Sequence, residues 1–205
     1  MVSGQGQRAR FLPLLGLANI LTILLAVVVA AIAARLAIQL LSLGSAQSRH
    51  SLINVRLDKA ADFTIFGLSI LLVVWFRRAR INAERHDYRQ RRARGWAFWG
   101  WIVPIVNIWF PYQIMGDIWR AGLPVQQRRK TAWLPALWWT CWLLSGVAVG
   151  AQAMAANSGT VPHLAADTQS ASLWFLAIAG AMLIPIIRSV STGPVGSALT
   201  YRTPT

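Results

Sequence analysis

Residues 75–119 read WFRRARINAERHDYRQRRARGWAFWGWIVPIVNIWFPYQIMGDIW, an arginine-dense segment followed by an apolar, tryptophan-rich one. Such a junction is typical of a membrane surface, because arginine binds anionic headgroups and indole rings favour the bilayer interface. The apolar part, residues 96–119, is long enough to cross a ~30 Å hydrocarbon core as one straight helix. Pro104 and Pro111 interrupt it, since each lacks the N–H of a continuous helix. The stretch is therefore either a kinked transmembrane helix or a hairpin that enters and leaves on the same side.

Polar residues inside this segment predict what holds it together. Backbone carbonyls freed by proline are costly in hydrocarbon unless protein or water satisfies them. We expect Asn107, which lies between the two prolines, to cap freed backbone. We expect Asp117 to meet either Arg120 or an arginine of residues 77–94.

The distribution of basic residues favours the hairpin. Of the 20 Lys and Arg residues, 16 share one face if residues 96–119 do not cross the bilayer. If they do cross, the eight arginines of residues 77–94 and the basic cluster of residues 120–130 fall on opposite faces. Cytoplasmic flanks attract Lys and Arg. We therefore expect four transmembrane helices plus one Pro-broken re-entrant or interfacial segment, with both termini in the cytoplasm; the alternative is five crossings.

Composition supports an all-α integral membrane protein of the cell membrane. The chain is 56% hydrophobic and only 13% charged, which is unusual for a soluble domain. A net charge of +14 is compatible with nucleic-acid binding, but the arginines flank apolar runs, where orientation in the bilayer explains them. We therefore expect anionic membrane lipids as partners and no nucleic acid.

Four apolar runs are the expected spans, and they lie at residues 11–34, 60–76, 133–154 and 171–187. The second helix is expected to continue beyond residue 76, because no Pro or Gly follows until Gly95. We expect residues 1–190 to form a single membrane domain. Residues 191–205 are rich in Ser, Thr, Gly and Pro, which predicts a disordered tail.

Two further features concern contacts between spans. Asp62 lies near the outer end of the second span, where Arg35 of the first span is the expected partner, with a proton or ion role as the alternative. Gly146 and Gly150 form a G-x-x-x-G pattern that permits close helix approach, either within the chain or in a homodimer.

The arginine-rich stretch also carries a family resemblance. The pattern consists of Trp75, Arg78, Arg80 and Asn82, followed by Trp96, Trp101, Pro104, Asn107, Pro111, Ile118 and Trp119. It resembles a bacterial, largely actinobacterial membrane family known only as domain of unknown function 4328. The resemblance implies a small multi-span membrane protein without an established activity, so it transfers no catalytic residue. The sequence departs from the family pattern at Ala83-Glu84-Arg85, where small residues are usual.

Motifs of catalysis are absent from the sequence. No H-E-x-x-H, G-x-S-x-G, P-loop or dinucleotide fingerprint occurs, so we expect no enzymatic activity, no cofactor and no metal site. One hypothesis is a non-enzymatic membrane module whose cytoplasmic Arg/Trp surface binds anionic lipid or a partner membrane protein. The alternative is a small transporter or channel that uses Asp62 and the polar break at Asn107. The predicted Arg/Trp surface consists of Arg77, Arg78, Arg80, Arg85, Arg89, Arg91, Arg92, Arg94, Trp96, Trp99 and Trp101.

Overall fold

The structure, a computed structural model, describes residues 12–41, 52–85, 95–123, 133–158 and 162–196. Within its helices, the side chains of residues 52–63, 97, 101–102, 104, 156, 158 and 162–166 lie outside the description. The described ranges fold into helices joined by short connections and contain no strand.

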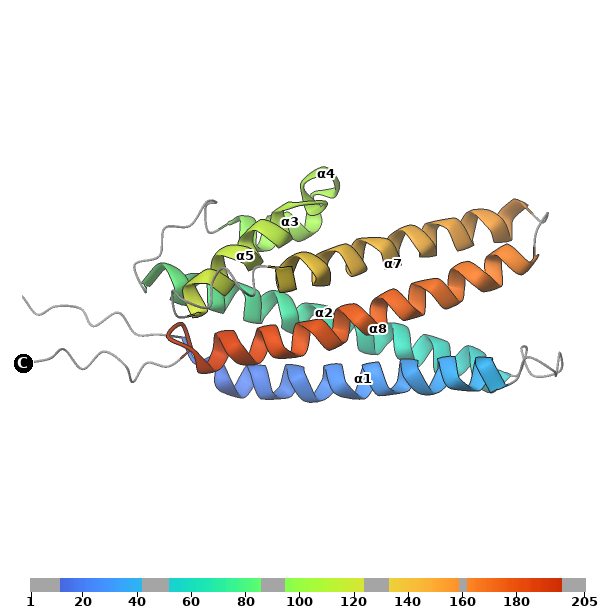
Figure 1. Cartoon of the computed structure of the whole chain (residues 1–205), viewed down its shortest axis with the longest axis horizontal. Coiled ribbons are helices and arrows are strands. Elements are labelled where there is room, and N and C mark those ends of the chain that lie inside the picture. Colours follow the sequence, from blue (N-terminus) through green and yellow to red (C-terminus); the bar gives the residue numbers. More distant parts are fainter. Residues whose placement is uncertain (1–11, 42–51, 86–94, 124–132, 159–161, 197–205) are drawn as a thin grey trace, which may run out of the picture.

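Long helices run side by side along the molecule (Figure 1). They are α1 (Leu15–Leu41), α2 (Leu52–Arg85), α7 (Trp133–Ser158) and α8 (Pro162–Thr192). Helix α8 packs between α1 and α7, and α2 packs against α1. The start of α1 and the end of α8 lie at the same end of the bundle, where α2 also ends.

Among the described residues, three helices are long and apolar enough to cross a bilayer: α1, residues Trp133–Ala155 of α7, and Asp167–Thr192 of α8. Large apolar side chains remain exposed along them, including Ile23 and Val27 of α1 and Val147 and Met154 of α7. An outward-facing apolar surface of this kind suits lipid contact. The chain is therefore a multi-pass membrane protein.

Helix α2 contains the remaining predicted span. It is continuous to Arg85, as the lack of Pro and Gly beyond residue 76 predicts. Its first twelve residues have no described side chains, and a crossing by α2 stays a prediction.

The Pro-broken segment forms three short helices: α3 (Trp96–Ile102), α4 (Pro104–Asn107) and α5 (Phe110–Gly122). Both prolines lie in the first turn of a helix, where a missing N–H breaks no hydrogen bond. Val103, which precedes Pro104, is extended at φ −78° and ψ 111°, because a residue before proline is pushed out of the α region. The expectation that residues 96–119 are not one straight helix is confirmed.

Helices α3 and α5 fold back on each other, and α4 forms the tip between them (Figure 1). The rings of Trp96 and Phe110 meet edge to face with centroids 4.7 Å apart. A Cβ atom on Gly100 would lie 3.3 Å from the Cβ atom of Phe110, so glycine lets the two helices approach closely. We call residues 96–122 the hairpin.

Helix α5 attaches the hairpin to the bundle. Its contacts with the bundle are made to α2, α7 and α8. Ile114, Met115 and Ile118 are buried on this side, in the same cluster as Trp75 and Phe76 of α2. The hairpin therefore covers the bundle at the end where α1 begins and α8 ends.

The end of α8 and the two glycines of α7 differ from the sequence predictions. The predicted disordered tail is wrong for residues 191–196, because α8 continues to Thr192, and Ser191 and Val195 are buried; residues 197–205 lie outside the described part. The predicted packing of Gly146 and Gly150 within the chain is also wrong, since a Cβ atom on either glycine would meet no described atom within 4 Å. Both glycines face outward from α7, and a homodimer through them stays a prediction.

Candidate functional site

Asn82 ties both ends of the described chain to α2. Its side chain is 0% exposed. Its Oδ1 atom accepts a hydrogen bond from the Leu12 N–H at 2.9 Å, and its Nδ2 group donates to the carbonyls of Leu12 at 2.9 Å and Val195 at 3.0 Å. A buried amide that satisfies three backbone groups fixes these segments relative to one another. We call Asn82, Leu12 and Val195 the terminal clasp.

Neighbouring contacts strengthen the same end of the bundle. The indole N–H of Trp75 donates to Ser191 Oγ at 3.0 Å, and both side chains are fully buried. Gly193 lies so close to the Gly122 carbonyl that no side chain fits between them. The end of α8 is thereby fixed to both α2 and α5.

The terminal clasp marks what we call the basic end of the bundle. Arg77, Arg78 and Arg85 lie in the last turns of α2, and Arg120 and Arg188 lie near the ends of α5 and α8. These two helix ends are in contact, because a Cβ atom on Gly122 would lie 3.3 Å from the Val190 backbone. The fold therefore gathers arginines from separate parts of the sequence at one end.

Arg80 does not belong to an exposed basic surface. Its side chain is 1% exposed, and its Nη2 atom lies 3.2 Å from Glu84 Oε1. The predicted role of Arg80 in an exposed Arg/Trp surface is therefore wrong, because α3 and α5 pack against α2 at this end. Arg80 and Glu84 lie four residues apart on one helix, a spacing that brings the two side chains together.

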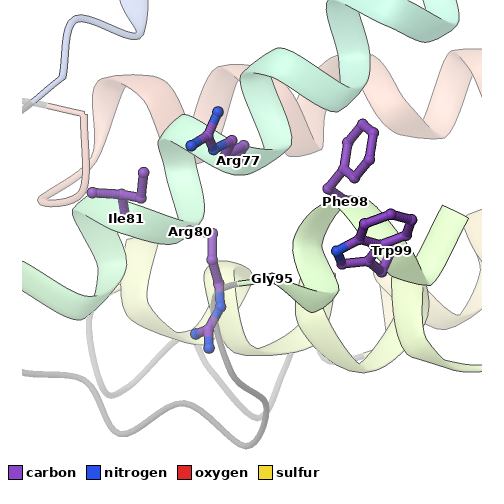
Figure 2. A pocket seen from close by; sticks show the side chains of 6 residues that line it. All are labelled: Arg77, Arg80, Ile81, Gly95, Phe98 and Trp99. Carbon is purple, nitrogen blue, oxygen red and sulfur yellow. The ribbon is translucent and has the colours of Figure 1, made fainter.

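A groove of about 490 Å³ lies between the last turns of α2 and the start of α3 (Figure 2). Arginines from α2 form one wall, and aromatic rings of α3 stand opposite. Phe98 is 45% exposed and Trp99 is 54% exposed, with ring centroids 5.4 Å apart. The groove is lined by Arg77, Arg80, Ile81, Gly95, Phe98 and Trp99.

The two arginines of the groove differ in their surroundings. Arg77 is exposed and forms no ion pair with any residue of the described ranges, whereas Arg80 is buried and paired with Glu84. Figure 2 shows the two side chains leaving α2 in different directions. Among the described residues that line the groove, Arg77 is thus the accessible cation.

Other members of the predicted surface lie elsewhere. Arg78 donates to the Pro13 carbonyl at 3.4 Å, and Trp96 packs on Phe110 inside the hairpin. Arg85 is exposed at the end of α2. The remaining predicted surface residues, whose side chains lie outside the described part, are Arg89, Arg91, Arg92, Arg94 and Trp101. Sequence reasoning missed Phe98 and Ile81, although Phe98 stands next to Trp99 in the same aromatic run.

The hairpin tip is held by a residue that the sequence did not single out. Trp139 of α7 donates its indole N–H to the Ile108 carbonyl at 2.6 Å. The predicted capping by Asn107 is not seen in the described part of the chain, where the structure gives its side chain no hydrogen bond and its buried Oδ1 atom has no partner. The predicted contact of Asp117 is confirmed, because Arg120 donates to its Oδ1 atom at 2.6 Å.

Two predicted features remain without a structural test. Arg35 is half-buried in α1, but the side chain of its expected partner Asp62 lies outside the described part. Within the described ranges, no group of three or more His, Cys, Asp or Glu residues could hold a metal ion.

Comparison with known proteins gives one match. The model of a family described as "Domain of unknown function (DUF4328)" matches residues 51–192, which include α2, the hairpin, α7 and α8. No curated protein and no solved structure matches the chain.

Proposed function

The chain belongs to the DUF4328 family, and we propose that it is a non-enzymatic membrane module whose Arg/Trp surface binds anionic lipid. The observation that carries this proposal is the groove between α2 and α3, which is lined by an accessible arginine and by two exposed aromatic rings. Guanidinium groups bind phosphate through two parallel hydrogen bonds, and aromatic rings favour the level of the headgroups.

The groove suits a lipid better than a protein partner. At about 490 Å³ it has the size of a small-molecule site. Lipid headgroups are present at high local concentration at a membrane surface, so even a weak site is occupied.

The proposal includes a topology. We place the basic end in the cytoplasm and let α1, α2, α7 and α8 cross the bilayer, with the hairpin entering and leaving on the cytoplasmic side. Helices α3 and α5 have 7 and 13 residues, or about 10 and 20 Å of length, which is too short to span a ~30 Å core. The contact of Ile108 with Trp139, in the second turn of α7, supports a shallow position for the hairpin tip.

Transport remains the alternative function, and it depends on Asp62, whose side chain is not described. Liposome flux assays on Asp62→Asn address it. A flux that this variant abolishes, without any lipid preference of the protein, would favour a transporter.

Lipid copurification tests the proposed function. The loop variant R89Q/R91Q/R92Q/R94Q removes four arginines from the Arg/Trp surface, and the matched control R8Q/R10Q/R188Q/R202Q removes four arginines outside it. Because the surface binds anionic headgroups, we expect mass spectrometry of native nanodiscs to find less anionic lipid with the loop variant only. Equal recovery from both variants would contradict lipid binding, and loss of one copurifying protein would assign the surface to a partner instead.

A further inference from the structure

We infer that the groove between α2 and α3 binds the headgroup of a phospholipid with a single phosphodiester, as in phosphatidylglycerol. Arg77 binds the phosphate, and Glu84 keeps the charge that the described residues give the groove at one positive unit. This inference rests on the proposed function and adds the lipid class and the residues that select it.

Arg77 is the residue that meets the phosphate. It is exposed on the wall of the groove and pairs with no acidic residue of the described ranges. Its guanidinium group can therefore offer its hydrogen-bond donors to a ligand without breaking an existing ion pair. An Arg–phosphate contact is charge-assisted and stronger than a neutral hydrogen bond.

Arg80 and Glu84 form the second part of the site. Their side chains are 1% and 19% exposed, and the atoms of the ion pair are 3.2 Å apart. Separating such a pair leaves a charge in a poorly solvated position, which favours the paired state. Because the two charges cancel, Arg77 supplies the net charge of the groove among the residues that the structure describes.

This charge balance predicts which lipid headgroups the groove prefers. One phosphodiester carries one negative charge and neutralises Arg77. A phosphomonoester carries about −1.5 to −2 at pH 7, so its additional charge meets Glu84 without a second available cation among the described residues of the groove. A zwitterionic headgroup has no net charge for the groove to attract.

The apolar lining selects a lipid over free phosphate. Ile81, Phe98 and Trp99 contribute apolar area beside the arginine. Gly95 adds no side chain at the start of α3, so the groove stays open there. These surfaces can contact the glycerol and the first acyl carbons, which inorganic phosphate lacks.

Native mass spectrometry of the detergent-solubilised full chain tests the phosphate contact. The probes are phosphatidylglycerol and phosphatidylcholine with identical acyl chains. We expect Arg77→Gln to lower phosphatidylglycerol retention about tenfold, the effect of losing one charge-assisted contact, whereas Arg188→Gln, an exposed arginine of the same end, leaves it unchanged. Equal retention by both variants would overturn the inference while leaving the proposed function intact. A wild-type chain that does not prefer phosphatidylglycerol to phosphatidylcholine would overturn both.

Two variants test the role of Glu84. Glu84→Gln and Ile81→Lys each raise the groove charge by one unit, and Ile81→Lys does so without breaking the ion pair. Both should shift the binding ratio from phosphatidylglycerol toward phosphatidic acid, whereas Glu84→Asp should retain the wild-type ratio. Thermal melts identify a variant that fails to fold. If Glu84→Gln fails to fold, the lipid-binding ratio of Ile81→Lys alone tests the charge argument. An unchanged ratio of phosphatidylglycerol to phosphatidic acid binding overturns the charge argument. Displacement of the bound lipid by millimolar inorganic phosphate overturns the assignment of the ligand as a lipid.

Discussion

The indole N–H of Trp139 donates to the carbonyl oxygen of Ile108 at 2.6 Å and joins α7 to the tip of the hairpin. Trp139 is buried, so the carbonyl at the turn is satisfied by protein. Chain reversal inside an apolar environment requires such a partner, because each unsatisfied backbone group is costly there. This contact explains how a segment interrupted by two prolines can remain in place.

Trp139→Phe keeps the ring and removes the donor. We expect the free energy of unfolding in detergent to fall by about 1–3 kcal/mol, the cost of leaving one part-buried carbonyl unpaired. Trp142→Phe is the matched control, because the Trp142 indole makes no hydrogen bond to a described residue. Equal effects of the two substitutions would refute the role of the Trp139 donor.

Asn107→Leu is expected to leave the stability unchanged or to raise it. The buried Oδ1 atom has no partner in the described part of the chain, so an apolar side chain of similar volume removes an unfavourable polar group. Thermal melts in detergent measure the change. A loss of about 1 kcal/mol or more would restore Asn107 as the residue that caps the break.

Local spacing predicted much of the structure. The apolar runs predicted the helices α1, α7 and α8, and the two prolines predicted where the broken segment divides. Arg120 was one of the two alternatives expected as the partner of Asp117, and the two residues lie three apart on one helix. Each of these features depends on residues that are close in sequence.

Contacts between distant residues were not predictable in this way. Asn82 meets Leu12 and Val195 across 70 and 113 residues, and only the packing of three helices brings them together. The burial of Arg80 has the same origin, because it depends on the hairpin folding onto α2. The groove was missed in part because its walls come from helices separated by residues 86–94.

The terminal clasp is expected to contribute strongly to stability. Asn82→Leu removes one acceptor and two donor contacts, so we expect a loss of about 2–4 kcal/mol in the free energy of unfolding. Asn19→Leu in α1 is the control, since Asn19 is exposed and its side chain makes no hydrogen bond to a described residue. Chemical denaturation in mixed micelles measures the free energy of unfolding of both variants. Similar losses for the two variants would mean that the terminal clasp contributes little to stability.

Substitution of glycine by alanine should change the stability differently at different positions. A Cβ atom on Gly193 would overlap the Gly122 carbonyl and lie 2.8 Å from the Ser189 carbonyl oxygen, so backbone must move. We expect Gly193→Ala to cost about 1–3 kcal/mol. Gly146→Ala meets open space in a helix and should be neutral or stabilising. Thermal melts of the two variants in one detergent compare them, and a stable Gly193→Ala variant would argue against this close approach.

The topology that we propose is tested by cysteine labelling of intact cells. After Cys141→Ser, single cysteines replace Ser48, Gln127 or Ser158 in separate variants, and an impermeant maleimide is added outside. If the hairpin enters and leaves on the cytoplasmic side, the variants at Ser48 and Ser158 react at once, and the variant at Gln127 reacts only after permeabilisation. Labelling of the Gln127 variant in intact cells would mean that residues 96–119 cross the bilayer, and it would contradict the hairpin topology.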